Sequence, residues 1–198
     1  MEEFHLLTYP DERLREVCAE VKKFGEEFWR KVDALLERVR EWRGVGLAAP
    51  QVGWNARVFV ANTTGKPEDS LVFVNPQIEK QRGRVVADEG CLCFPGLSAE
   101  IPRSAWIRAS AIGRDGKPFA LEAEGLLARC IQHETDHLDG ILLIDRMRDV
   151  DRLALAPELR EMERRRPRQR RRRRPSRPGP GAEGYFSVFS FESFSVSA

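Results

Sequence analysis

The sequence predicts an α+β fold in which antiparallel or mixed β-sheets pack around a central, metal-binding helix. Three observations support this prediction: an amphipathic stretch at residues 26–42, several short strand-like segments between residues 57 and 123, and a helical stretch at residues 125–138 that contains two histidines. A helix, then several strands, then another helix is an element order typical of α+β domains. A short last helix, interrupted or restarted at Pro157, is expected at residues 151–166.

Composition limits the class of protein. The chain has 198 residues, 41% of them hydrophobic, which suits one globular domain with a tail. No stretch reaches the roughly 18 consecutive apolar residues of a membrane span, and the acidic N-terminus does not resemble a signal peptide. The four cysteines are too few and scattered for a disulfide framework. We therefore expect a cytoplasmic protein with reduced thiols and no membrane contact.

Charge is divided unevenly along the chain. Residues 164–198 hold ten Arg and two acidic residues, which leaves 23 basic and 29 acidic residues in 1–163. The last segment is Arg-rich, then rich in Pro and Gly, then rich in Ser and Phe, compositions typical of linkers and disordered tails. The sequence thus predicts a folded domain at residues 1–166 and a disordered tail at residues 167–198.

The first predicted elements lie in residues 10–51. Residues 10–14 predict a turn or a first helical turn. The helix at 26–42 has apolar residues at helical spacing with charges between them, which predicts core packing: Phe28, Val32, Leu35, Leu36, Val39 and Trp42. Residues 44–51 form an uncharged loop of mostly small residues. Its glycines and alanines would let a ligand approach the backbone, although a tight turn would have the same composition.

Five strand-like segments follow. They are rich in Val, Ile, Phe and Ala and lie at residues 57–61, 71–74, 83–87, 106–112 and 119–123. Asp115-Gly116 separates the last two, and this dipeptide predicts a β-hairpin. With the helices before and after them, these short strands predict an antiparallel or mixed sheet.

The helix at 125–138 carries the strongest chemical signal. Positions four apart lie on one helix face, so His133 and His137 can direct both imidazoles at one metal ion. Glu134 can reach a water on that ion without being a ligand. Gly140 provides a stop just beyond the helix. The alternative, a pair of packed or surface histidines, is weakened because the chain has only three His in total.

Two histidines leave a catalytic metal one ligand short of the usual three. No His follows His137, but the segment 88–96 contains Cys91 and Cys93 between a Gly and a Pro. In extended backbone, residues two apart face the same way. The spacing alone therefore does not choose between the two thiols.

Three segments together resemble the motifs of the peptide deformylase family in order and spacing. They are Gly-Val-Gly-Leu-Ala-Ala-Pro-Gln at 44–51, Glu-Gly-Cys-Leu at 89–92, and Gln-His-Glu-Thr-Asp-His at 132–137. The similarity extends from about residue 5 to about residue 150. The resemblance implies a metal-dependent hydrolase that removes the formyl group from N-formylmethionine of nascent polypeptides and releases formate. It implies Fe²⁺ as the usual cofactor, with Zn²⁺, Ni²⁺ or Co²⁺ as working substitutes.

The resemblance also implies residue roles. The metal ligands would be Cys91, His133 and His137. The catalytic groups would be Glu134 as general acid/base, with the Gln51 amide and the Leu92 N–H as donors to the formyl oxygen. Substrate binding would involve the Gly46 backbone and a methionine pocket of Val45, Leu126, Arg129 and Cys130, and Glu89 would form a supporting salt bridge with Arg103.

Two residues depart from the family pattern. Cys93 stands where the family usually has Ser, and a second thiol predicts faster oxidative inactivation or a competing ligand. Arg129 stands where an apolar residue often lines the pocket. Its stem is expected to lie along the methionine side chain with its head in water, or else the residue simply lies on an exposed helix face.

Other functions fit parts of the sequence. A metal-dependent aminopeptidase or protease would cleave unformylated peptides, but a third ligand downstream of His137 is missing. A nucleic-acid-binding protein would use the Arg-rich tail and need no metal. Because deformylases act near the ribosomal exit, residues 164–177 could also dock an otherwise catalytic protein on the ribosome or its rRNA; the alternative is a solvated basic run without a partner.

Overall fold

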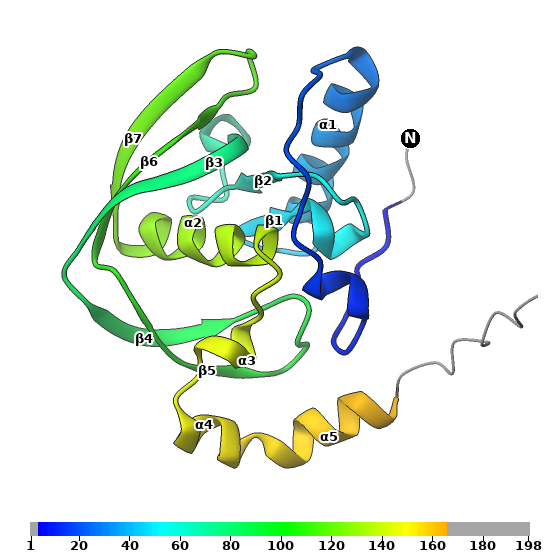
Figure 1. Ribbon diagram of the computed structural model, residues 1–198, viewed down its shortest axis with the longest axis vertical. Coiled ribbons are helices and arrows are strands. Elements are labelled where there is room, and N and C mark those ends of the chain that lie inside the picture. Colours follow the sequence, from blue (N-terminus) through cyan, green and yellow to red (C-terminus); the bar gives the residue numbers. More distant parts are fainter. Residues whose placement is uncertain (1–3, 166–198) are drawn as a thin grey trace, which may run out of the picture. The chain divides into compact units, whose positions relative to one another are not determined.

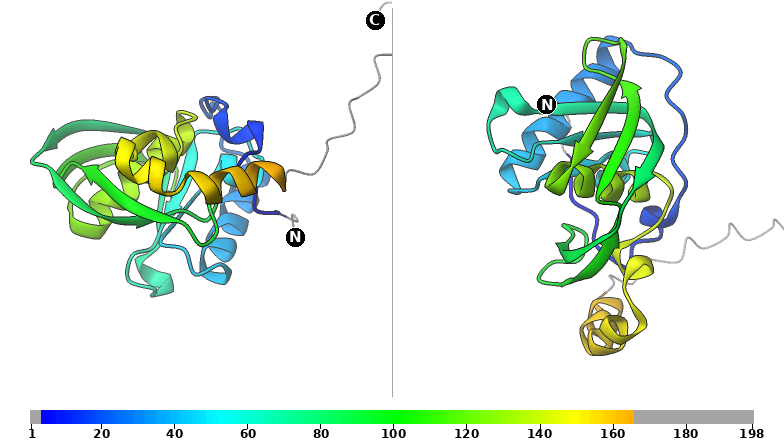
Figure 2. Two further views of the ribbon diagram at one scale, coloured as in Figure 1. Left: turned by 90° about the horizontal axis from the view of Figure 1, so that it is seen from below. Right: turned by 90° about the vertical axis from the view of Figure 1, so that its left-hand side faces the viewer.

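Helix α2 (Gly125–Leu138) lies between two antiparallel β-sheets in the computed structural model, which describes residues 4–165 (Figure 1). The larger sheet has the strand order β1-β2-β3-β6-β7 and the smaller one pairs β4 with β5. The strands are β1 (Gly46–Ala48), β2 (Val58–Ala61), β3 (Leu71–Arg82), β4 (Val85–Gly90), β5 (Ser98–Arg103), β6 (Trp106–Ile112) and β7 (Pro118–Glu124). The predicted α+β fold around a central helix is confirmed, and Figure 2 shows the same layers from two further directions.

Helix α1 (Glu26–Glu41) covers the β1-β2 end of the larger sheet. Its stripe of Val32, Leu35 and Val39 is fully buried. These side chains belong to a cluster with Val58 and Val60 of β2. The amphipathic pattern therefore drives core packing, as predicted.

The strand predictions were correct in part. The structure contains strands close to the predicted ones, and the hairpin between β6 and β7 turns at residues 113–117, where the Gly113 N–H donates to the Lys117 carbonyl at 2.8 Å. Strand β3 extends eight residues beyond its predicted end at residue 74, and β4 begins at Val85 rather than residue 83. The extra length of β3 consists mainly of polar residues, which mask a strand pattern.

Two strands were missed. Residues 44–51, predicted as a loop, contain β1 and the short 3-10 helix η2 (Ala49–Val52). Strand β5 has two charged residues and Pro102 in its sequence, yet Ala99 and Ile101 alternate inward. Pairing with β2 forms β1, and pairing with β4 forms β5. Composition within a short window does not report such partners.

The remaining elements lie outside the sheets. They are the 3-10 helices η1 (Glu12–Arg15) and η3 (Pro67–Asp69) and the helices α3 (Leu143–Arg146), α4 (Asp149–Ala154) and α5 (Ala156–Arg164). The restart of the last helix near Pro157 is as predicted. Gly140, with φ +70°, follows the end of α2, and its N–H donates to the His137 carbonyl at 3.2 Å. No helix within residues 4–165 combines the length and apolarity needed to cross a bilayer.

Helix α5 packs against the segment that follows β4. Leu159 is buried in a cluster with Cys93 and Phe94. The ring of Tyr9 stacks on Phe94 with centroids 5.1 Å apart, and the Tyr9 hydroxyl donates to Glu163 at 2.6 Å. The N-terminal segment and the last helix therefore hold the 91–97 turn from two sides. The predicted boundary at residue 166 and the predicted disorder of 167–198 lie outside the described residues and stay predictions.

We expect Leu35→Ala to lower the free energy of unfolding by about 2–5 kcal/mol, because it opens a cavity where α1 meets the sheet. Leu153→Ala is the matched control, since Leu153 is 74% exposed on α4, and it should change stability by less than about 0.5 kcal/mol. Urea denaturation measures both variants. Equal losses would show that α1 is not part of the cooperative core.

Candidate metal centre and substrate pocket

Helix α2 holds both of its histidines on one buried face. His133 and His137 project from the same side one turn apart, with ring centroids 4.9 Å apart and an interplanar angle of 76°. Every residue from Ala128 to Leu138 is buried. The helix therefore places two imidazoles side by side inside the protein, as the motif predicts.

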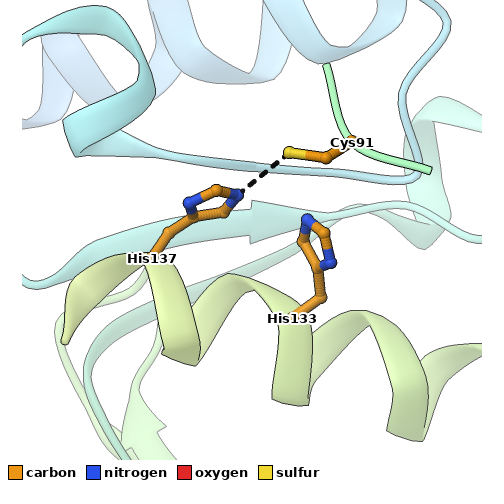
Figure 3. A group of neighbouring side chains, drawn as sticks. All are labelled: Cys91, His133 and His137. Carbon is orange, nitrogen blue, oxygen red and sulfur yellow. Dashed lines mark hydrogen bonds between the residues drawn. The ribbon is translucent and has the colours of Figure 1, made fainter. Parts of the chain in front are cut away.

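The turn after β4 brings Cys91 to the histidine pair. Cys91 Sγ lies 3.3 Å from His137 Nε2, and Figure 3 shows the thiol facing the rings from the opposite side. One ligand atom from each of Cys91, His133 and His137 lies within 4.8 Å of the other two. A thiolate with two imidazoles is a donor set suited to Fe²⁺, Zn²⁺, Ni²⁺ or Co²⁺.

The structure distinguishes the two thiols that the spacing left open. The segment is a turn, closed by the Phe94 N–H donating to the Cys91 carbonyl at 2.9 Å, so the assumption of extended backbone does not hold. Cys93 is buried beneath the turn with its Sγ 3.3 Å from Gln51 Nε2. A hydrogen bond between Cys91 and Cys93, together with burial, raises the pKa of the Cys91 thiol to about 11. Coordination to a cation would counter this shift by favouring the thiolate.

One buried, unpaired oxygen beside the three ligand residues fits a metal site. Among the buried side-chain nitrogen and oxygen atoms of residues 4–165, only Glu134 Oε2 and His137 Nδ1 have no hydrogen-bond partner. Such atoms are uncommon, because burying an unpaired polar group costs free energy. A divalent cation with a water beside it would satisfy the Glu134 oxygen. The residues present therefore fit a metal ion.

The carboxylate of Glu89 holds the first histidine. Glu89 Oε1 accepts from His133 Nδ1 at 2.6 Å, which leaves His133 Nε2 for the cation. Arg103 donates hydrogen bonds to the same carboxylate from Nη2 at 2.7 Å and from Nε at 3.2 Å. Burial alone would raise the pKa of Glu89, but the bonds from His133 and Arg103 hold it well below its usual range. The salt bridge expected from the family resemblance is present and buried.

This ion pair extends into a network that the sequence analysis missed. Arg103 Nη1 also contacts Asp136 Oδ2 at 2.5 Å, and Arg146 donates to the same carboxylate through Nε at 3.0 Å and Nη2 at 2.6 Å. Asp136 lies on α2 between the two histidines but lines a separate surface groove together with Arg103 and Arg146.

Glu134 is the carboxylate next to the three ligand residues. Burial raises the pKa of Glu134 to about 7, whereas a cation beside it would favour the charged form. Its side chain packs directly on the backbone of Gly46. A Cβ at residue 46 would overlap Glu134 Oε1 and lie 2.7 Å from Cys130 Sγ. Glycine at this position therefore makes room for the carboxylate.

Two hydrogen-bond donors lie close to Cys91. Gln51 Oε1 accepts from the Ala48 N–H at 2.7 Å, which orients the amide so that Nε2 lies 3.9 Å from Cys91 Sγ. The Leu92 N–H, next to the thiol, donates to no other described residue. These are the two groups that the resemblance assigns to an oxyanion.

A cavity of about 650 Å³ opens in front of this centre. All five expected substrate residues line it: Val45, Gly46, Leu126, Arg129 and Cys130. Val45 and Leu126 are 42% and 50% exposed at its mouth. Strand β1 is an edge strand of the larger sheet, and its start forms one wall. The cavity is thus apolar, open to solvent, and bordered by main chain that can accept a peptide.

The expectation for Arg129 was wrong in both of its forms. The residue is 8% exposed, so it neither lies on an exposed face nor holds its head in water. Its Nη1 donates to Glu89 Oε2 at 2.7 Å and to the Ile101 carbonyl at 3.1 Å. A carboxylate forty positions earlier draws the guanidinium inward, and the helix sequence alone does not reveal that partner. Arg129 still lines the cavity, but its guanidinium is held by Glu89 and the Ile101 carbonyl.

Comparisons with known proteins agree with this geometry. The sequence model of the family described as polypeptide deformylase matches residues 4–153. The chain is 39% identical over 160 residues to the peptide deformylase of Chromobacterium violaceum, covering 81% of this chain and 96% of that protein. It is 41% identical over 160 residues to that of Alkalilimnicola ehrlichii, covering 80% and 90%.

Solved structures give the same result. The peptide deformylase from Legionella pneumophila superposes with a TM-score of 0.77 at 36% identity, covering 83% of this chain and 99% of that chain. The enzyme from Plasmodium falciparum gives 0.78 at 35% identity, covering 81% and 95%.

We expect Cys91→Ser to abolish tight metal binding, because it removes the sulfur that faces both imidazoles. Cys93→Ser is the matched control in the same turn and should keep the metal. The measurement is metal content after dialysis, with the thiolate-to-cobalt absorption band of the Co²⁺-loaded protein as the second readout. Cys93→Ser should also slow inactivation by peroxide. Unchanged peroxide sensitivity and metal content in Cys93→Ser would mean that the second thiol does not affect the centre.

Proposed function

Because this chain belongs to the polypeptide deformylase family, we propose that Cys91, His133 and His137 hold its metal ion and that Glu134, Gln51 and Leu92 carry out its catalysis. Enzymes of this family remove the N-formyl group from nascent peptides and depend on a metal. The observation that carries the assignment of residues is the convergence of one thiol and two imidazoles beside an apolar cavity that Cys91, His133 and the buried Glu134 line.

Glu134 is the proton carrier in this proposal. When bound, a divalent cation supplies Lewis acidity, which makes a water nucleophilic near neutral pH. Glu134 accepts the proton from the attacking water and then donates it to the amine that leaves the formyl carbon. Its position against Gly46, with Oε2 free of other partners, supports this role. The products are formate and a free N-terminus.

Gln51 and Leu92 stabilise the negative charge that develops on the formyl oxygen. The Gln51 amide is oriented by the Ala48 N–H, so its Nε2 donor is fixed before the substrate arrives. The Leu92 N–H is the second donor. Removing one preorganised donor of this kind typically costs about 10²–10³ in kcat.

The methionine side chain occupies the cavity of Val45, Gly46, Leu126, Arg129 and Cys130. The residues are mainly apolar, which suits an unbranched thioether chain. The free edge of β1 gives the substrate main chain a partner for strand-like hydrogen bonds. The exposed positions of Val45 and Leu126 support a pocket that a nascent chain can enter from solvent.

We assign Fe²⁺ as the resident ion, with Zn²⁺, Ni²⁺ or Co²⁺ able to replace it. The mixed sulfur and nitrogen donors support this choice over Mg²⁺ or Ca²⁺, which prefer oxygen. The four cysteines are free thiols, and ferrous iron beside a thiolate requires a reducing compartment, so we place the enzyme in the cytoplasm. The catalytic domain is assigned to residues 1–166, supported by the packing of α5 on the 91–97 turn.

Activity against a formylated peptide tests the function directly. We expect wild-type protein to release formate from formyl-Met-Ala-Ser, and Glu134→Gln to lose about 10²–10⁴ in kcat while keeping its metal. The same peptide without formyl is the substrate control. Cleavage of that peptide would indicate an aminopeptidase or protease instead. RNA binding that survives Glu134→Gln in a protein without metal or formate release would indicate a nucleic-acid-binding protein.

The basic tail is assigned to ribosome contact through residues 164–177. Helix α5 is fixed to the domain through Leu159 and Glu163, so the Arg run starts from an anchored point. Contacts between arginine and phosphate weaken steeply with salt. Deletion of residues 167–198 should therefore reduce co-sedimentation with ribosomes at low salt and leave peptide deformylation unchanged. Equal binding with and without the tail at matched salt refutes this assignment.

A further inference from the structure

We propose that Arg129 is a positioning residue of the metal centre, which acts through Glu89 to hold the strand that carries the thiol against the helix that carries the imidazoles. The proposal rests on the metal ligation assigned above. It adds a role that differs from lining the methionine pocket. Arg129 touches neither the metal ligands nor the formyl group in this role.

The hydrogen bonds of Glu89 divide between its two oxygens. Oε1 accepts from His133 Nδ1 at 2.6 Å and from Arg103 Nη2 at 2.7 Å. Oε2 accepts from Arg129 Nη1 at 2.7 Å and from Arg103 Nε at 3.2 Å. Arg129 therefore makes the shorter bond on the oxygen that does not touch the histidine. Its bond opposes rotation of the carboxylate away from His133.

Arg129 and His133 lie four residues apart on α2 and hold the same carboxylate from one helix face. Glu89 lies on β4, two residues before Cys91. The pair thus joins α2 to the strand whose end carries the third ligand. The distance from Cys91 Sγ to His137 Nε2, 3.3 Å, depends on this connection between two separate elements.

The guanidinium of Arg129 also donates hydrogen bonds to the smaller sheet. Nη1 also donates to the Ile101 carbonyl at 3.1 Å, and Nη2 donates to the Val85 carbonyl at 3.4 Å. These carbonyls belong to β5 and β4, so the side chain spans from α2 to both strands. Because the guanidinium bonds to Glu89 and to carbonyls of both strands, it is not free to move with a bound substrate.

Arg129→Met separates this role from substrate binding. Methionine keeps an apolar stem of similar length in the cavity but cannot bond to Glu89. We expect the rate of Ni²⁺ loss to a chelator to rise about tenfold, since partners of metal-bound histidines are typically worth 10–100-fold in metal affinity. The absorption of the Co²⁺-loaded protein should change as well, whereas a role confined to the methionine pocket would raise KM for formyl-Met-Ala-Ser and leave that absorption as in the wild type.

Two further variants make the test decisive. Arg129→Lys restores one charged donor and should recover part of the metal retention, and it replaces Arg129→Met if that variant does not fold. Arg108→Met is the matched control, because Arg108 forms only exposed ion pairs on β6, and it should leave Ni²⁺ loss unchanged.

Unchanged Ni²⁺ loss in both Arg129 variants would overturn the proposal, as would a higher KM with an unaltered Co²⁺ spectrum. Formate release by the metal-saturated Arg108→Met control reports on the proposed function separately. If this control is inactive while Arg129→Met loses Ni²⁺ quickly, the positioning role stands and the assigned reaction fails.

Discussion

The buried carboxylate of Glu89 is the constraint on which the rest of the centre depends. It accepts bonds from a histidine and two arginines that come from two different elements, α2 and β5. A charge in this position is costly to bury unless every lone pair has a partner, and removing one partner leaves the others uncompensated. The network therefore tolerates one arrangement of α2 relative to the smaller sheet. That arrangement brings the thiol and the imidazoles together.

A second set of contacts holds the thiol turn from outside. Tyr9 contacts the turn twice: its N–H donates to the Cys93 carbonyl at 2.9 Å, and its ring stacks on Phe94. Its hydroxyl donates to Glu163 on α5. The first and last parts of the described chain thus meet at the segment that carries Cys91. Sequence positions far from the motifs support the geometry of the site, because a turn has few backbone bonds of its own to keep it rigid.

Much of the site could be predicted from the sequence because its signals are local. The pair His133 and His137 follows from helical spacing, and α1 follows from its apolar stripe. Spacing could not distinguish Cys91 from Cys93, because their positions depend on a turn and not on strand alternation. The family motif indicated Cys91, which is the thiol that lies beside the two imidazoles. Strand β5 and the orientation of Arg129 were missed for different reasons. Strand β5 contains two charged residues and a proline, which interrupt a strand pattern, whereas Arg129 is oriented by Glu89, a partner forty positions earlier in the sequence.

The edge position of β1 affects the range of peptides that the protein can bind. A strand edge offers amide and carbonyl groups, and every peptide carries the complementary groups whatever its side chains. A protein that reads one terminal side chain in a cavity and the following residues by their main chain is selective at the first position and indifferent afterwards. One gene product can then serve the whole set of newly made proteins, and the sequences of those proteins remain free to evolve.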